Sequence, residues 1–325
     1  MPFTDEQRDI NTFKVGDLVQ GFYLVREIAF KSGKNNTRYG DFVLGDRTGQ
    51  VDAKLWQYGI GEEEKYKPNI LVKVRGRVLA WQGQLQLRIE KIRPASEADE
   101  LSLDDFVESA PISGSEMYEE ILAYVEKITD PDLKKLTGHL VKQKEDILKY
   151  CPGAKSNHHA IKGGLLYHTL TMLKAGEKMC EVYSYLDRGL LFCGVILHDI
   201  AKTDELMTND LGMVTDYTTE GLLLGHITQG ISLIDAAGTT LDIPREKVVL
   251  VEHMLLSHHY EPEFGSPRRP MFLEAEMLHF LDMIDTRMYD MKRVSDALQP
   301  GEFSERQWLL HNRRIMKVDD SEDQK

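Results

Sequence analysis

The dipeptide His198-Asp199 constrains this chain most, because it closes an apolar run that reads as a buried helix. The run covers residues 190–197, and Ile200-Ala201-Lys202 follows the dipeptide. Burying a carboxylate without a partner costs free energy, and a bound cation offsets that cost. A His and an Asp side by side at such a place indicate a metal site, although the dipeptide alone also occurs by chance.

Further candidate ligands follow the same pattern. None of the 11 histidines lies in the first 130 residues. Beyond them, four more segments present a His or an Asp within or beside an apolar helical pattern: His168, His226, His258 and Asp282. Inward-pointing ligands from several helices are how bundle cores build metal sites. Cys151, Cys180 and Cys193 show no C-x-x-C spacing, so a thiolate zinc site is not expected.

A lone histidine on an apolar helix face is more often a core residue than a ligand. His139 and His279 are assigned to the core on that basis, and Asp285 is expected to cap a helix or pair with Arg287. His158 and His159 are expected to form a loop pair.

The metal hypothesis depends on the whole ordered set of five segments. Their order, H…HD…H…H…D, resembles the HD-domain metal-dependent phosphohydrolases over roughly residues 115–300. The resemblance implies an all-helical domain with one or two divalent metals at its centre. Imidazole and carboxylate ligands suit several divalent ions. Mn²⁺ is the expected metal, and Co²⁺, Fe²⁺, Mg²⁺ and Zn²⁺ are the alternatives.

The first hundred residues show a different pattern, that of short strands. Five are expected, opening at Leu18–Val25 and continuing at Tyr39–Leu44, Gln50–Trp56, Ile70–Ala80 and Leu85–Ile92. Turns at residues 45–49 and 81–84 connect two pairs of them. Five short strands with these turns favour a Greek-key barrel. The expected fold class is therefore multidomain α+β, a five-stranded OB-type β-barrel followed by an all-α HD domain.

Residues 42–56 resemble the hairpin between strands 2 and 3 of nucleic-acid-binding OB-folds. Such barrels stack the bases of single strands on aromatic side chains in a basic groove. The candidate aromatics are Tyr39, Trp56, Tyr58 and Trp81, at least half of which are expected to fill the barrel core instead. The candidate basic contacts are Lys34, Arg38, Arg75 and Arg77.

Charge separates the two halves. The whole chain carries a net charge of −13, but residues 1–95 hold 16 Lys and Arg against 12 Asp and Glu. The asymmetry places the basic surface on the barrel and favours nucleic-acid binding there.

The expected domains are a barrel over residues 1–95, a polar linker over 96–115, the HD domain over 116–312 and a disordered acidic tail over 313–325. Helices are expected from Glu116 to Ile128, capped by Ser113 or Ser115, and from Asp130-Pro131 to Lys149. Few cysteines and no signal-like N-terminal segment make a reducing cytoplasm the natural setting.

A barrel followed by an HD domain resembles the YhaM family of bacterial 3′→5′ exoribonucleases over nearly the whole chain. The most specific stretches are residues 158–169, 198–203, 256–259 and 264–267. Two positions depart from the expected pattern: Ala201 and Tyr260 stand where the family commonly has glycine. Neither is a proposed ligand.

The resemblance implies a two-metal phosphodiesterase that acts on single-stranded RNA, with single-stranded DNA also possible, and releases nucleoside 5′-monophosphates. His168, His198, Asp199 and Asp282 would hold one ion, and Asp199 would bridge to a second held by His226 and His258. His253 is the alternative to His258.

Other residues are expected to act on substrate. Lys202 lies one helical turn after His198 and would neutralise phosphoryl charge, unless it is a surface lysine at a helix end. His259 and Arg268 are candidate substrate contacts.

Two other functions stay open at this point. The chain could hydrolyse a small nucleotide, with the barrel serving regulation, or it could bind nucleic acid with an inactive HD site. A homo-oligomer that encloses the strand is also expected.

Overall fold

The computed structural model of the chain describes residues 7–32, 38–56, 58–59, 61–101, 103–155, 159–209 and 211–318. The chain divides into two compact units, Met1–Ser109 and Ala110–Lys325. A five-stranded barrel in the first unit and a helical domain in the second confirm the predicted fold class. No helix among the described residues is long and apolar enough to cross a membrane.

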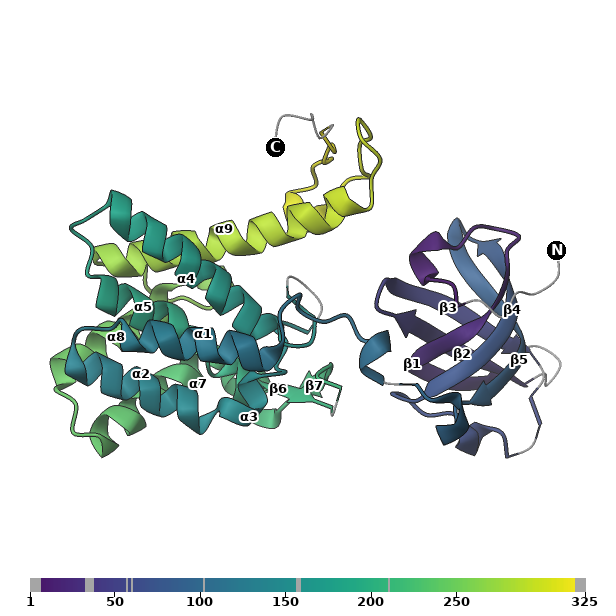
Figure 1. Cartoon of the computed structure of the whole chain (residues 1–325), viewed down its shortest axis with the longest axis horizontal. Coiled ribbons are helices and arrows are strands. Elements are labelled where there is room, and N and C mark those ends of the chain that lie inside the picture. Colours follow the sequence, from purple (N-terminus) through teal and green to yellow (C-terminus); the bar gives the residue numbers. More distant parts are fainter. Residues whose placement is uncertain are drawn as a thin grey trace. The chain divides into compact units, whose positions relative to one another are not determined.

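The first unit is a closed barrel with strand order β1-β2-β3-β5-β4 (Figure 1). Its strands are β1 (Leu18–Ser32), β2 (Arg38–Asp46), β3 (Gly49–Trp56), β4 (Leu71–Trp81) and β5 (Gln84–Pro94). All neighbouring pairs are antiparallel except β3 and β5, which run parallel. Alternate residues such as Val19, Phe42 and Leu87 point inward and are fully buried, as expected for strands with one face in a core.

Asp46 fixes the turn between β2 and β3. Its Oδ1 accepts hydrogen bonds from the Thr48 and Gly49 backbone N–H groups, and its Oδ2 accepts one from the backbone N–H of Ile10. Ile10 opens the short 3-10 helix η1 (Ile10–Thr12), which lies against β3. A second 3-10 helix, η3 (Glu63–Lys65), lies between β3 and β4.

The segment predicted to be a polar linker is more structured than expected. It contains the 3-10 helices η4 (Glu97–Asp99) and η5 (Leu103–Phe106), and η5 contacts β1 and β2. Phe106 and Val107 are buried, which explains why this part of the segment belongs to the barrel unit.

The second unit begins with α1 (Gly114–Glu126), which is capped by Ser113 and Glu116 in a reciprocal capping box. α2 (Pro131–Gln143) starts at the Asp130 cap and ends six residues earlier than predicted. Lys144 leaves helical geometry there, and its ammonium pairs with Asp204. The short α3 (Glu145–Leu148) follows.

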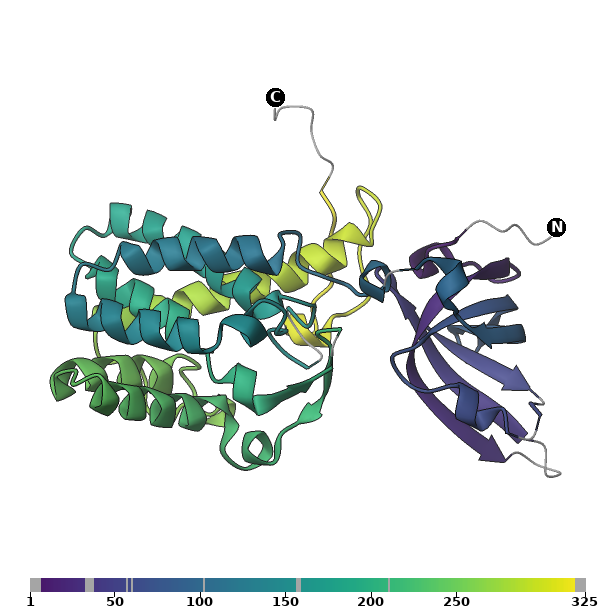
Figure 2. The ribbon, with the colours of Figure 1, turned by 60° about the horizontal axis from the view of Figure 1, so that its bottom comes forward.

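The remaining helices form the body of the domain. They are α4 (Gly164–Val182), α5 (Arg188–Leu197), α6 (Lys202–Glu205), α7 (Thr219–Thr240), α8 (Arg245–Ser257) and α9 (Leu273–Asp296). α5 contacts both α4 and α9 (Figures 1 and 2). Most of α5 is apolar and buried, so it forms the centre of the core around which the other helices pack.

Two features of this unit were not predicted. A two-stranded sheet, β6 (Leu206–Thr208) with β7 (Val214–Tyr217), interrupts the helices between α6 and α7.

The second feature follows α9 and the 3-10 helix η7 (Trp308–Leu310). The tail predicted to be disordered is structured over residues 313–318. Arg313 and Met316 form backbone bridges with Gln307 and Phe303, and Ile315 is buried. Residues 319–325 of that predicted tail lie outside the described residues.

Candidate metal centre

Five helical segments bring the predicted ligands to one buried place. His168 comes from α4, His198 and Asp199 follow the last turn of α5, and His226 lies on α7. His258 ends α8, and Asp282 lies on α9. His198 and His258 are essentially inaccessible to solvent, and His168 and Asp199 are buried.

Two glycines lie beside the ligands. Gly194 on α5 faces Met254 on α8, and a Cβ at this position would lie 2.1 Å from the Met254 Cε, so the end of that side chain would have to move. Gly225 interrupts α7 with a φ of 68° and a ψ of 162°, directly before His226. Gly225 is therefore the position whose backbone conformation favours glycine.

One half of the centre gathers His168, His198 and Asp282. The Nε2 atom of His168 lies 3.3 Å from His198 Nε2 and 3.4 Å from Asp282 Oδ1. His198 Nε2 also lies 3.3 Å from Asp199 Oδ2. The ligand atoms of His168, His198 and Asp282 all lie within 4.8 Å of one another, close enough for one ion to bind all three.

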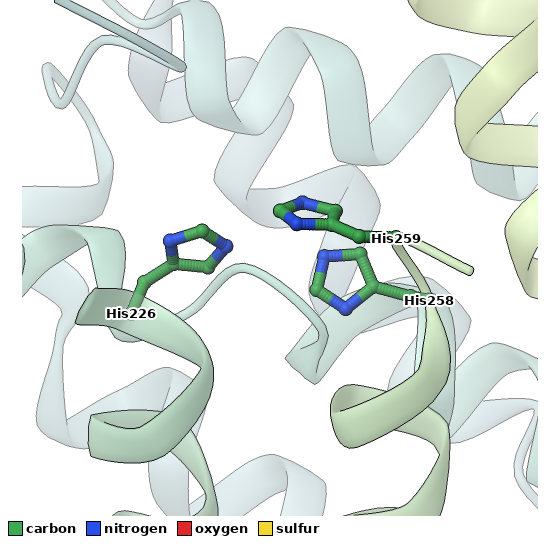
Figure 3. A group of neighbouring side chains, drawn as sticks. All are labelled: His226, His258 and His259. Atoms are coloured by element: carbon green, nitrogen blue, oxygen red, sulfur yellow. The ribbon is translucent and has the colours of Figure 1, made fainter. Parts of the chain in front are cut away.

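The other half gathers His226, His258 and His259, whose rings converge from α7 and the end of α8 (Figure 3). His226 Nε2 and His258 Nε2 lie 3.3 and 3.8 Å from Asp199 Oδ1. Asp199 therefore directs one carboxylate oxygen to each half, which is the arrangement of a bridging ligand.

The imidazoles are held in one orientation. His198, His258 and His259 donate their Nδ1–H groups to the carbonyl oxygens of Val195, Leu255 and Phe264 at 2.8, 2.7 and 2.6 Å. These bonds fix the tautomer and leave Nε2 as a lone-pair donor for a cation.

Two carboxylates orient the remaining imidazoles. His168 Nδ1 lies 2.7 Å from Asp285 Oδ2, and His226 Nδ1 lies 3.2 Å from Glu205 Oε2. His159 Nε2 lies 2.8 Å from the same Asp285 oxygen. Burial opposes ionisation of Asp285, but the hydrogen bonds from His159 and His168 lower its pKa to about 2.

Several residues have roles that sequence reasoning missed. Asp285 neither caps its helix nor pairs with Arg287, because one turn after Asp282 it points to the same interior. Buried His159 orients Asp285, while His158 lies outside the described residues. Spacing along α9 is the only signal that could have indicated Asp285, whereas Glu205 and His159 become neighbours of the ligands only in the fold.

Lys202 is mostly buried and lies beside the bridging carboxylate. Its Nζ is 2.7 Å from Asp199 Oδ2, at the start of α6, which excludes the surface lysine at a helix end. Burial opposes ionisation of Asp199, but Lys202, His198 and His226 together hold the pKa of this carboxyl well below its usual range. For Lys202, burial is outweighed by Asp199, so the pKa of its ammonium is raised.

The donor set fits a divalent cation. Asp199 Oδ1, His226 Nε2 and His258 Nε2 are buried ligand-type atoms that have no hydrogen-bond partner among the described residues. Burial and the neighbouring imidazoles hold the pKa of His258 well below its usual range, so this ring stays neutral and able to coordinate. Unpaired buried polar atoms are costly unless an ion completes the site.

A cavity of about 290 Å³ opens beside this centre. Asp282, His258 and His259 line it on the ligand side, together with His279. The exposed ring of Phe264 and the side chains of Met283 and Thr286 complete its walls. The cavity is large enough for a small organic group next to the ligands.

Comparison with known proteins agrees with this geometry. The HD domain family model matches residues 165–287. The 3′-5′ exoribonuclease YhaM of Shouchella clausii is 38% identical over 310 residues, covering 95% of this chain and 96% of its own. YhaM of Bacillus subtilis is also 38% identical, over 95% of this chain and 98% of its own. The chain belongs to the YhaM family of 3′-5′ exoribonucleases.

Among solved structures, the second OB-fold domain of replication protein A from Methanococcus maripaludis is 17% identical. It covers 28% of this chain and 96% of its own, with a TM-score of 0.24. The OB-type assignment of the barrel in this YhaM-family chain rests on its own strand order.

The two expected departures from the YhaM family pattern are both near the centre. Ala201 is buried in the turn after Asp199, where a methyl group is accommodated. Tyr260 has a φ of 67°, in the left-handed region that favours glycine. Its ring stacks on His279, with ring centroids 4.6 Å apart, and the guanidinium of Arg269 lies over it.

Three further histidines, His253, His139 and His279, do not belong to the two ligand groups. His253 Nε2 accepts a hydrogen bond from the backbone N–H of Met271, so the fold brings His258 to the centre instead. His139 is exposed on α2 and does not belong to the core, whereas His279 is buried. His259, predicted to face substrate, joins the second ligand group.

The barrel residues predicted to contact substrate lie on several faces. Trp56 is 49% exposed and stacks on Tyr39, with ring centroids 5.0 Å apart. Tyr58 packs against Phe30 at the edge of the core, and Trp81 is exposed in the hairpin between β4 and β5.

The other basic candidates differ in their surroundings. Arg38 pairs with Glu63. Exposed Arg268 lies in the loop before α9, and Lys34 lies outside the described residues.

Arg75 and Arg77 belong to a row of cations across β4 and β5. Three cross-strand pairs, at every second position of β4, carry like charge: Lys73 opposite Arg93, Arg75 opposite Lys91, and Arg77 opposite Arg88. Glu90 and Asp99 lie close to two of these cations. Like charges directly opposite one another destabilise a sheet, so this face favours an anionic partner.

Proposed function

We propose that this chain is a metal-dependent 3′→5′ exoribonuclease that removes nucleoside 5′-monophosphates from the end of single-stranded RNA. The observation that carries the proposal is the position of Asp199, which directs one oxygen to each of two imidazole-containing ligand groups. Family membership at 38% identity over 95% of the chain supports the same activity.

The site would hold two divalent ions. His168, His198, Asp199 and Asp282 are the ligands proposed for one, and His226, His258, His259 and Asp199 those for the other. Imidazole and carboxylate donors suit Mn²⁺ among the candidates. When bound, such ions supply Lewis-acid stabilisation of phosphoryl charge and activation of water.

The protein groups position the reacting strand. Water attacks the phosphorus of the terminal nucleotide, the bond from phosphorus to the preceding O3′ breaks, and that oxygen leaves as the new 3′-hydroxyl. Lys202 keeps its charge through its contact with Asp199 and would stabilise negative charge on the phosphoryl oxygens. Asp285 and Glu205 keep His168 and His226 aimed at the centre.

The barrel would bind the strand upstream of the cleaved end. The stacked Tyr39 and Trp56 offer a surface for bases, and the cation row on β4 and β5 offers contacts for phosphates. Replacing Arg77 and Arg88 by Ala should therefore weaken RNA binding and lower the slope of log affinity against log salt concentration by about 0.7 per lost contact. An unchanged slope would show that these cations do not contact the strand.

Gel electrophoresis of RNA labelled at its 5′ end tests the activity. With Mn²⁺, the wild-type protein should give a ladder that descends from the 3′ end, and EDTA should abolish it. Asp199→Asn should be inactive, whereas Asp296→Asn, on the exposed part of α9, should behave as wild type. Intact RNA with protein shown to contain metal would overturn the proposal, and phosphate release from mononucleotides would then favour a small-nucleotide hydrolase.

A further inference from the structure

Phe264 is unusual among the residues that surround the metal centre. It is an aromatic residue of the short 3-10 helix η6 (Pro262–Phe264), and 67% of its surface is exposed. Its side chain lines the cavity that also contains His258, His259 and Asp282. The ring is therefore largely uncovered by the rest of the domain and accessible to a molecule in the cavity.

The backbone of Phe264 is fixed to a candidate ligand. Its carbonyl oxygen accepts the Nδ1–H of His259 at 2.6 Å, and its N–H donates to the carbonyl of Glu261. The hydroxyl of fully buried Ser266 accepts the backbone N–H of His259 at 3.0 Å. The ring is therefore presented from a loop that is tied to the centre at two points, and its backbone is already ordered before a ligand arrives.

The lining of the cavity combines two kinds of chemistry. Imidazoles and the Asp282 carboxylate belong to the groups proposed to hold ions that attract phosphate. The Phe264 ring and the Met283 side chain supply apolar surface beside them. Thr286 lies in the wall too, but its hydroxyl already donates to the carbonyl oxygen of Asp282. A phosphate joined to a flat apolar ring system matches these two kinds of lining.

We propose that Phe264 is the platform on which the 3′-terminal nucleobase of the strand stacks while its phosphate lies at the metal centre. The inference rests on the exoribonuclease function proposed above and names the subsite for the leaving nucleotide. Because Phe264 and Met283 supply the apolar part of the lining and read no base edge, the subsite accepts all four bases and holds purines more tightly through their larger ring area.

Matched oligoribonucleotides test this subsite. Two strands of equal sequence are compared, one ending in adenosine and one ending in an abasic ribose. For the adenosine strand, Phe264→Ala should lower kcat/KM by about 10-fold or more, within the range for loss of one base–aromatic stack. Phe264→Trp should retain activity, and Phe264→Leu, which keeps apolar volume without an aromatic face, should resemble Phe264→Ala.

The abasic strand decides whether the lost contact is with the base. The wild-type protein should cleave its last linkage about as slowly as Phe264→Ala cleaves the adenosine strand, and Phe264→Ala should lose nothing further. Fluorescence anisotropy of both strands in EDTA supplies a readout without turnover and should show the same pattern. Tyr185→Ala, a control with a similarly exposed aromatic at 68%, should match wild type throughout.

An equal loss on both strands would overturn the inference, because it would assign Phe264 a structural role. An unchanged kcat/KM for Phe264→Ala would overturn it as well. Either result leaves the exoribonuclease proposal intact, since that proposal fails only if the wild-type protein does not shorten RNA at all.

Discussion

Asp285 Oδ2 lies 2.7 Å from His168 Nδ1, so a buried carboxylate on α9 orients a proposed metal ligand on α4. The carboxylate remains ionised because its pKa is about 2, held down by hydrogen bonds from His159 and His168 against the effect of burial. An ionised partner makes the imidazole a better electron-pair donor and fixes its direction. Asp285 therefore acts on the centre without being a ligand of the proposed site.

Asp285→Asn should lower the affinity for the ion at His168 by about 10- to 100-fold, the usual effect of removing such a partner. The amide keeps the shape of the side chain but loses the charge that supports His168. Competition with a chelating dye measures this affinity. Asp296→Asn, a change of the same chemistry in an exposed ion pair on α9, serves as the control. Equal affinities in all three proteins would contradict the role given to Asp285.

Lys202→Met should destabilise the metal-free protein by about 3–5 kcal/mol, because it removes one partner of a buried ion pair and leaves Asp199 without it. Urea unfolding in EDTA measures the free energy of unfolding. Added Mn²⁺ should recover part of the loss, since a bound cation compensates the same carboxylate. Lys149→Met breaks the more exposed pair with Glu145 and should cost clearly less than Lys202→Met, because an exposed ion pair contributes little to stability. If both variants lose the same amount, Lys202 is not the partner that stabilises buried Asp199.

Metal content should follow the two ligand groups. Elemental analysis of the wild-type protein should give two ions per chain, and His226→Ala or His259→Ala should give one. His253→Ala should retain two, because its ring bonds to the backbone of Met271 outside the centre. One ion in the wild-type protein, or a loss in His253→Ala, would contradict the assignment.

The amino-acid sequence carried enough information for the barrel and for the order of the ligands. Strand alternation and turn residues indicate which faces of β1–β5 are buried, and the apolar run ending at His198 is the buried core helix that was predicted. The ligands follow because each interrupts an apolar pattern with a group that is costly to bury.

The residues that orient the ligands could not be found in this way. Glu205 is 21 positions from His226, and Asp285 is 117 positions from His168. Apart from the position of Asp285 one turn after Asp282, nothing local marks these carboxylates as different from surface ones, because their neighbours come from other helices. The break at Lys144 was missed as well, and the ammonium of this residue pairs with Asp204, 60 positions away.

Stability of the metal-free protein should fall as pH falls from about 7.5 to 5.5. Burial lowers the pKa of His258 and His259 in the folded chain, so both bind protons less readily there than in the unfolded chain, where histidine titrates near pH 6.5. An unfolded state that binds more protons makes the free energy of unfolding rise with pH, by about 1.4 kcal/mol per unit for each net proton. His198 acts in the opposite sense: burial is outweighed by Asp199, its folded pKa is raised, and its contribution is lost at higher pH.

Urea unfolding in EDTA at several pH values measures this dependence. His258→Asn removes one imidazole that stays neutral and should flatten the curve. His139→Gln, at an exposed position on α2, should leave it unchanged. A slope of zero or of opposite sign in the wild-type protein would contradict the prediction.

Tyr260 should show the stability order that left-handed backbone imposes. At a φ of 67°, Tyr260→Gly should be more stable than Tyr260→Ala by about 1 kcal/mol, because only glycine adopts this conformation without steric cost. Both variants lose the stacking on His279, so their difference isolates the backbone effect. At Glu119, an exposed position inside α1, the order should reverse by a similar amount, since alanine favours a helix over glycine. Thermal and urea unfolding of the four variants compares the two pairs, and the same order at both positions would show that Tyr260 carries no left-handed strain.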